Sequence, residues 1–115
     1  MSKIVLDYKQ DPELFNRTAK TWAEKINRTK KTQVRNYYDK ILELESDSKK
    51  DGFENVLPFV KMLNSKVAYG VGRRVVSYEF QEMMSECIKQ VKNENDLKVF
   101  KLFFEAVLGF FKGRD

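Results

Sequence analysis

Apolar residues recur every three or four positions along almost the whole chain, which is the spacing of helices that bury one face. The first stripe follows Asp11–Pro12, a dipeptide typical of a helix start because aspartate can cap the helix and proline suits its first turn. Its members are Phe15, Ala19, Trp22 and Ile26. The pattern therefore predicts a first helix that begins at Pro12.

Three more amphipathic helices are expected after this one. The second begins at Thr32 and ends in the polar segment 46–52, which has the composition of a loop. The third covers 53–72, with Pro58 near enough to its start to cost little, and the fourth covers about 75–92. Their stripes are Val34, Tyr38, Ile41 and Leu44 or Glu45; Val56, Val60, Leu63 and Val67; and Val76, Phe80, Met83, Cys87 and Val91.

The last helix, expected over about 97–112, is apolar around more than half of its circumference. Such an arc is typical of a helix that is central to a bundle or partly covered by a partner. We expect both, with one side in the core and one in a subunit interface. No useful strand alternation occurs, so the prediction is an all-α protein, a compact bundle of about five helices. It forms a single helical domain over 1–115, with 1–10 as a flexible N-terminal segment.

The composition excludes several kinds of chemistry. The chain has no histidine, so the usual general base and the commonest zinc ligand are missing. Cys87 is its only cysteine, which rules out an intrachain disulfide, and its place beside Met83 and Met84 predicts a buried thiol. We expect no catalytic residue, metal or cofactor. Neither a signal peptide nor a stretch of the ~20 apolar residues that span a bilayer is present, which predicts a cytoplasmic protein without a membrane partner.

The formal charge of +5 favours an acidic partner only mildly, but the cations are unevenly spread. In the segment 66–74, Lys66 and Arg73 are seven residues apart and so share one line of a helix, with Tyr69 beside them and Arg74 next in sequence. Such cations can pair with phosphates, and an aromatic ring can stack on a base or ribose. Gly70 and Gly72 could admit RNA or another helix closely. Alternatively, the glycines end the helix and the cations are merely solvated.

A second basic segment covers 29–38. Lys31 and Arg35 lie one turn apart on a shared face, and Gln33 between them could donate or accept a hydrogen bond. The alternative is a solvated corner between two helices, with Arg35 paired to Asp39 one turn on. The candidate RNA-binding residues from both segments are Lys31, Gln33, Arg35, Lys66, Tyr69, Arg73 and Arg74.

Three blocks of the sequence resemble, in order and spacing, those of a known family. They are Thr32–Gln33–Val34–Arg35–Asn36–Tyr37–Tyr38, Lys66–Val67–Ala68–Tyr69–Gly70–Val71–Gly72–Arg73, and Phe104–Glu105–Ala106–Val107–Leu108–Gly109–Phe110–Phe111–Lys112. The family is the small subunit of the type III-A CRISPR interference complex, the Csm complex. The resemblance covers roughly 29–112.

The resemblance implies a small helical protein without catalytic activity. Several copies would line the inner face of a ribonucleoprotein in antiviral defence, beside the backbone subunit and the large signature subunit. They would support the guide RNA and its pairing with target RNA through sequence-independent contacts. The matching positions are Gln33 and Arg35 in the first block and Lys66, Tyr69 and Arg73 in the second. Glu105 in the third block looks like a packing or subunit contact.

The residues alone leave two other functions open. One is a helical protein–protein interaction module that docks through the last helix and has no nucleic-acid role. In that case the cations are solvation only, and a homodimer is plausible. The other is an enzyme, which is less favoured because the carboxylates of Glu79, Glu82 and Glu86 fit a solvated helix face better than a metal site.

Overall fold

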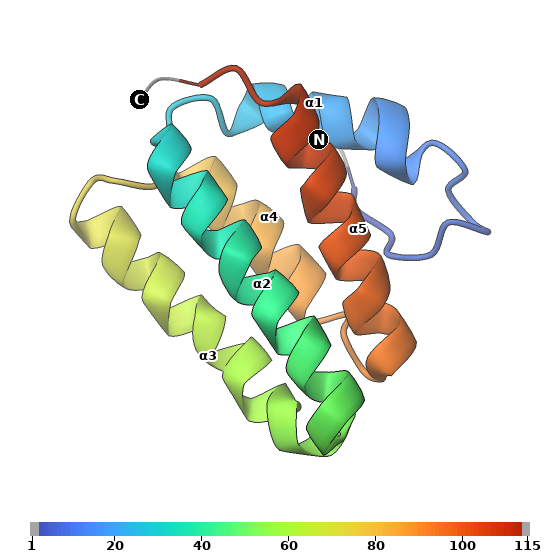
Figure 1. Ribbon diagram of the computed structural model, residues 1–115. Helices are drawn as coiled ribbons and strands as arrows, with labels where there is room; N and C mark the ends of the chain where they lie inside the picture. Colours follow the sequence, from blue (N-terminus) through green and yellow to red (C-terminus); the bar gives the residue numbers. More distant parts are fainter. Residues whose placement is uncertain (1–2, 114–115) are drawn as a thin grey trace.

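The structure, a computed structural model, describes residues 3–113, and these form five α-helices, one short π-helical turn and no strand (Figure 1). The elements are η1 (Leu14–Thr18), α1 (Ala19–Lys25), α2 (Lys31–Asp51), α3 (Phe53–Gly72), α4 (Tyr78–Ile88) and α5 (Glu94–Phe110). The predicted all-α bundle is confirmed.

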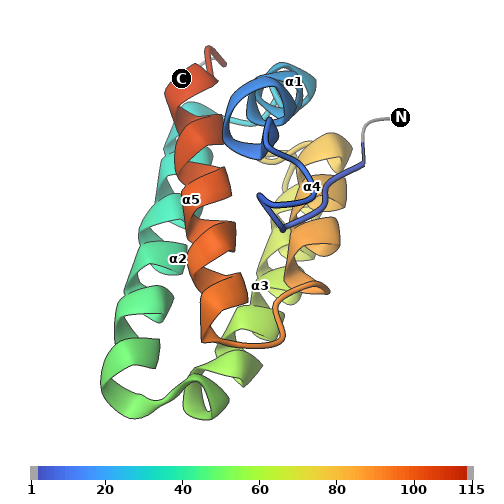
Figure 2. The ribbon, with the colours of Figure 1, turned by 90° about the vertical axis from the view of Figure 1, so that its right-hand side faces the viewer.

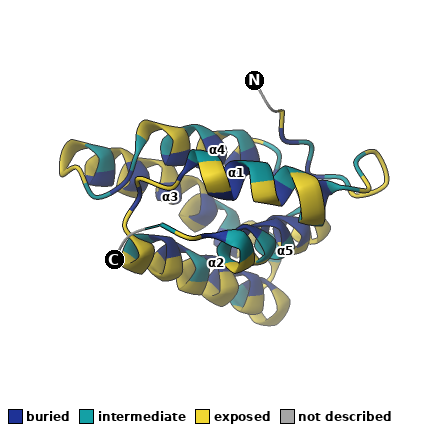
Figure 3. Cartoon of the chain, turned by 90° about the horizontal axis from the view of Figure 1, so that it is seen from above, coloured by how far each residue is buried: buried dark blue, intermediate teal, exposed yellow. Residues whose placement is uncertain are grey.

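Four of the helices form the body of the bundle, and α1 lies across one end of it (Figures 1 and 2). α2 packs against α5 on one side and α3 on the other, while α4 packs against α3. α2 and α3 run in opposite directions and are joined by Gly52, whose φ of +94° is accessible to glycine. Seen from above, the buried residues face the interior and the exposed ones face outward (Figure 3). The bundle therefore presents a broad outer surface along α2 and α3.

The polar segment 46–52 is not the predicted loop, because α2 continues to Asp51. Ser48 is buried, and its hydroxyl donates a hydrogen bond of 3.2 Å to Glu94 at the start of α5. Lys49 reaches back to the buried Glu45 at 3.1 Å. The bond from Ser48 and the ion pair of Glu45 accompany the continued helix, and the chain turns at Gly52.

α5 supplies a large part of the core, and most of its wide apolar arc is covered by the chain itself. Phe100, Phe103 and Phe104 are fully buried, and α1, α2 and η1 pack around the helix. Among residues 3–113, none of the exposed large hydrophobic side chains belongs to α5. Leu102, Leu108 and Phe110 are only half-buried, so the core confirms one side of the expected division of α5, and the subunit interface on its other side stays a prediction.

The described part of the N-terminal segment, residues 3–10, is packed onto the domain rather than free of it. Ile4 and Leu6 are buried, although this segment was expected to be flexible. Gln90 holds it in place: its side-chain carbonyl accepts from the Leu6 N–H and its amide donates to the Ile4 carbonyl, both at 2.9 Å. The first two residues of the predicted flexible segment lie outside the described residues.

Helix ends differ from the predicted ones by a few residues. The first helix begins with the π-helical turn at Leu14 rather than at Pro12. α4 is shorter than expected, since it starts after Ser77, whose hydroxyl accepts from the Phe80 N–H at 3.1 Å. α5 starts earlier, because Asn93 rather than Asp96 caps it. Cys87 is buried in α4, as predicted.

Candidate nucleic-acid interface

One exposed flank of α3 carries three of the candidate residues. Lys66, Tyr69 and Arg73 follow each other at intervals of three and four and are all exposed. The guanidinium carbon of Arg73 lies 5.7 Å from the centroid of the Tyr69 ring, a cation–π arrangement. Tyr69 nevertheless keeps 69% of its surface exposed. The ring therefore has room to stack on a further planar group.

The same flank continues toward the start of α3 with two exposed apolar residues that the sequence analysis did not single out. Met62 and Phe59 precede Lys66 by four and seven residues and are 42% and 53% exposed. Their spacing from Lys66 in the sequence already predicted that they share its face of the helix. Because they lie beside the core stripe in sequence, nothing in the pattern alone separated them from core residues.

Gln33 and Lys66 come together across the helix pair although 33 residues separate them. Both line a hollow of about 180 Å³ between α2 and α3, together with Asn36, Tyr37, Lys40 and Leu63. Gln33 is half-buried and Lys66 is exposed. The first turn of α2 thus faces the middle of α3, and one ligand could contact both helices there.

Charge changes along the groove between these helices. A neighbouring hollow of about 300 Å³ shares Lys40 and Lys66 but extends to Glu43, Asp47 and Asp51 near the Gly52 turn. The far end, at Gln33, has no acidic lining among the described residues. A polyanion is therefore attracted to the end away from the turn and repelled from the turn itself.

Lys31 and Arg35 belong to a different surface. At about 100° per residue, Arg35 points about 160° away from Gln33 around α2. Arg35 is exposed, and the Arg35–Asp39 pair offered as an alternative does not form. None of the five candidate cations makes an ion pair with a carboxylate within residues 3–113. All five charges are consequently available to an external anion.

Glu105 stabilises contacts within the bundle. It accepts a hydrogen bond of 3.1 Å from the Tyr38 hydroxyl and pairs with Lys101 at 3.5 Å. Burial and then the hydrogen bond to Glu105 raise the pKa of Tyr38. The hydrogen bond from Tyr38 joins α2 to α5 and agrees with a packing role for the third sequence block.

Arg73 caps the end of α3, and Arg74 follows it in a different backbone conformation. Its φ is +63°, the only positive value at a non-glycine position within residues 3–113. The Arg74 N–H donates to the Val71 carbonyl at 2.9 Å and the Val75 N–H to the Gly70 carbonyl at 3.0 Å, the two bonds of a Schellman helix end. The chain turns sharply there, so the two arginines serve different surfaces.

Arg74 lines a hollow of about 440 Å³ with Arg28 and Tyr78. Tyr78 is 75% exposed. Tyr78 is not among the candidate residues, although its place between the core positions Val76 and Phe80 could have indicated an outward side chain.

The two glycines of the middle block, Gly70 and Gly72, differ in the space around their missing side chains. A Cβ on Gly70 would lie 2.9 Å from Cγ2 of Val76, so this glycine is required by the return of the chain into α4. A Cβ on Gly72 would meet nothing within 4 Å. The expectation that both glycines admit an external partner is therefore corrected for Gly70.

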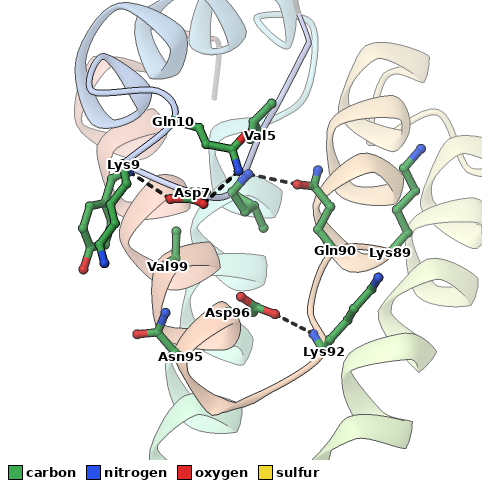
Figure 4. A pocket seen from close by; sticks show the side chains of 12 residues that line it. Val5, Asp7, Lys9, Gln10, Lys89, Gln90, Lys92, Asn95, Asp96 and Val99 are labelled. Atoms are coloured by element: carbon green, nitrogen blue, oxygen red, sulfur yellow. Dashed lines mark hydrogen bonds between the residues drawn. The ribbon is translucent and has the colours of Figure 1, made fainter.

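Another hollow, of about 760 Å³, lies between the N-terminal segment and the α4–α5 connection (Figure 4). It contains Lys9, Lys89 and Lys92, but none of the seven candidate residues lines it. Its two carboxylates hold backbone turns: Asp7 accepts from the Lys9 N–H and Asp96 from the Lys92 N–H. Both carboxylates of this hollow are therefore already used in local backbone hydrogen bonds.

Two further features of residues 3–113 bear on function. No three cysteine or acidic side chains in this range gather closely enough to hold a metal ion. In the same range, every helix is too short or too polar to cross a bilayer.

Comparison with known proteins gives a family. No curated protein and no solved structure is significantly similar to the chain. The family model described as Csm2 Type III-A matches residues 9–114, which is nearly the whole length. The match spans all three blocks and every candidate residue. The chain therefore belongs to the Csm2 type III-A family, the small subunits of the type III-A CRISPR complex.

Proposed function

We propose that this chain supports guide RNA, and the duplex of guide with target RNA, through sequence-independent contacts at the second half of α3 and the facing start of α2. The observation that carries the proposal is the exposed flank of Lys66, Tyr69 and Arg73, in which neither cation is paired with a carboxylate among the described residues. The subunit acts without catalysis of its own.

The chemistry of this flank suits a nucleic-acid backbone. Lys66 and Arg73 are about two turns apart, so they can neutralise separate phosphates of one strand. Tyr69 offers a ring face between them, and Arg73 stabilises that ring's position. Gln33 adds a neutral hydrogen-bonding group across the groove. Contacts of this kind carry no base information, as a subunit that serves any guide sequence requires.

Lys31, Arg35 and Arg74 contribute on other surfaces in this proposal. Lys31 and Arg35 lie on the opposite flank of α2, so they contact a different segment of RNA. One copy makes few contacts, and affinity in the assembled complex arises from several copies along the same RNA. The isolated subunit is therefore expected to bind RNA weakly and with a strong dependence on salt.

The test is the salt dependence of binding to an RNA labelled for fluorescence anisotropy. Replacing Lys66 and Arg73 by alanine should flatten the slope of log K against log[salt] by about 1.4, since each single-strand phosphate contact contributes about 0.7. The matched control replaces Lys61 and Lys98, which are exposed elsewhere and also lack ion pairs within residues 3–113. Equal flattening by both pairs would mean that net charge alone drives binding and would contradict the proposed interface.

A second contact, with protein, is favoured by Phe59 and Met62. Large exposed apolar side chains side by side are typical of subunit contacts. We infer that a neighbouring subunit of the complex, which can be another copy of this chain, covers them. In this proposal the docking face lies on α3, whereas α5 was the helix first expected to dock. Replacing both by serine should weaken incorporation into the reconstituted complex, whereas RNA binding by the isolated chain should be unchanged.

A further inference from the structure

Three separate segments of the chain meet at the end of α3 around a hollow of about 440 Å³. Arg28 comes from the α1–α2 connection, Arg74 from the α3–α4 connection and Tyr78 from the first turn of α4. The remaining lining residues are Val71, Gly72, Val76, Ser77 and Glu79. The volume lies within the range of about 300–1,000 Å³ that is typical of small-molecule sites.

We propose that this hollow holds one unpaired nucleotide of an RNA strand, with its base against Tyr78 and its phosphates between Arg28 and Arg74. The inference rests on the proposed function, because the strand that enters the hollow is the one that follows Lys66 and Arg73. Arg73 and Arg74 are adjacent in sequence but lie on the two sides of the helix end. A strand bound at Arg73 therefore enters the hollow by passing around the end of α3 to Arg74.

The charges of the hollow favour an anion. Arg28 and Arg74 converge on it, and neither is paired with a carboxylate within residues 3–113. Glu79 is the single acidic residue of the lining, so the lining keeps one net positive charge. Glu79 opposes phosphate binding, and it can accept a hydrogen bond from an amino or imino group of a base.

The backbone at Arg74 gives an independent argument. A left-handed conformation costs a non-glycine residue about 1–2 kcal/mol, and glycine is the usual residue at this point of a Schellman end. A strained backbone that carries a long cationic side chain, at the edge of a hollow, indicates that the side chain itself is used. Gly72, which has nothing within 4 Å of its missing Cβ, leaves space beside it.

Tyr78, the aromatic residue of the lining, favours a nucleotide base as the ligand over a phosphate alone. Tyr78 is 75% exposed, the largest exposure among the large apolar and aromatic side chains of residues 3–113. An exposed tyrosine beside arginines is the arrangement by which proteins stack single-stranded bases. A base inside a duplex cannot reach such a hollow without leaving its partner, so the site should select unpaired RNA.

The experiment is photo-crosslinking of the full chain to RNA that carries 5-iodouridine, followed by mass spectrometry of the crosslinked peptides. The inference predicts a crosslink at Tyr78 with single-stranded RNA and its loss when the same RNA is fully paired. Tyr78→Leu should weaken single-stranded binding at least about fivefold, as expected for loss of one stacked base. Tyr8→Leu, at another exposed tyrosine, is the matched control and should have no effect.

Two charge variants sharpen the test. Arg28→Gln should weaken binding and flatten the salt slope by about 0.7, the value for one phosphate contact. Glu79→Gln should strengthen binding, because it removes the one negative charge of the lining. Circular dichroism of each variant establishes that the helices are intact. If Glu79→Gln weakens binding, the phosphate arrangement in the hollow is overturned.

The outcomes separate this inference from the proposed function. Crosslinks at Tyr69 alone, with a binding loss in the Lys66/Arg73 variant, would overturn the nucleotide site and leave the α3 interface standing. Crosslinks at Tyr78 with an unaffected Lys66/Arg73 variant would support a nucleotide in the hollow but overturn the α3 interface and the path of the strand past Lys66 and Arg73. Absence of salt-dependent RNA binding by the full chain would overturn both.

Discussion

Gly70 and Val76 lie so close together that a Cβ on residue 70 would be 2.9 Å from a Val76 methyl group. Val76 is buried, and its branched side chain has few alternative positions. The contact fixes how the chain leaves α3 and enters α4. It therefore also sets the position of Arg73 and Arg74, which lie between the two residues in sequence.

Gly70→Ala is expected to lower the free energy of unfolding by about 1 kcal/mol. Overpacking costs about 1–3 kcal/mol, and the better helix propensity of alanine returns up to about 1 kcal/mol. Urea denaturation followed by circular dichroism measures the change. Gly109→Ala is the matched control, because a Cβ there meets nothing within 4 Å inside α5. It should stabilise by up to about 1 kcal/mol, and a stabilising Gly70→Ala would contradict the packing argument.

Arg74→Gly is expected to separate stability from RNA binding. Relief of the left-handed strain gains about 1–2 kcal/mol, and the greater freedom of glycine in the unfolded chain offsets up to about 1 kcal/mol of this. Thermal unfolding should thus be unchanged or shifted upward, while anisotropy shows weaker RNA binding. A valine at the same position should destabilise, since branched side chains fit this conformation poorly. Unchanged RNA affinity in Arg74→Gly would remove Arg74 from the binding surface.

Cys87 makes stability depend on alkaline pH. Complete burial raises the pKa of its thiol, with the charge of Glu86 adding to the effect. Above the pKa of about 8.5 that an unfolded cysteine has, the unfolded chain loses a proton that the folded chain keeps, so stability falls as pH rises. The expected slope is up to about 1.4 kcal/mol per pH unit.

The measurement compares unfolding of the wild type and Cys87→Ala between about pH 8 and 10, a range that begins near the unfolded-state pKa and extends above it. Alanine lowers overall stability through the cavity it leaves. It should also remove the part of the pH dependence of stability that the Cys87 thiol causes. A thiol reagent should also react with the native chain only as fast as it unfolds. Rapid reaction with the folded protein would show that Cys87 is accessible.

Gln90 is expected to hold the N-terminal segment on the domain. Its side chain makes three hydrogen bonds of 2.9 Å, one from the Leu6 N–H and two to the carbonyls of Ile4 and Glu86. Gln90→Ala leaves backbone groups of a buried segment without partners and should cost about 2 kcal/mol. Hydrogen exchange at the Leu6 amide should accelerate in the variant. Gln10→Ala, which loses only an exposed bond to Asp7, should leave that exchange rate unchanged.

The helices were predictable because periodicity reports burial directly, and the differences have specific physical causes. The segment 46–52 looked like a loop from its composition, but buried Ser48 finds its partner in Glu94, a residue 46 positions away. The spacing of apolar residues in α5 predicted the width of the apolar arc, but it could not predict what covers that arc. The topology shows that the chain itself covers most of it.

The candidate site was predictable along one helix and not between helices. Spacing alone placed Lys66, Tyr69 and Arg73 on one flank, because that relation is local. The approach of Gln33 to Lys66 depends on how α2 and α3 pack, and the separation of Arg73 from Arg74 depends on a single positive φ. Helix packing has no local sequence signal. The left-handed residue had none either, because it is an arginine and not a glycine.

The charge gradient of the α2–α3 groove leads to the last prediction. Glu43 and Asp47 line the groove near the turn, and Glu43 holds Lys40 in an ion pair of 3.5 Å. Glu43→Gln with Asp47→Asn should strengthen RNA binding several-fold, because it removes two repulsive charges and releases Lys40 toward the strand.

The control for this variant makes the same change of charge elsewhere on the surface. Glu24→Gln with Glu54→Gln alters two exposed carboxylates outside the groove lining, so at moderate salt it should change the RNA affinity much less. Anisotropy at two salt concentrations compares the pairs. If both variants strengthen binding equally, the RNA responds to net charge and does not run along this groove. A larger effect of the groove pair, shrinking as salt rises, places the phosphates beside α2 and α3.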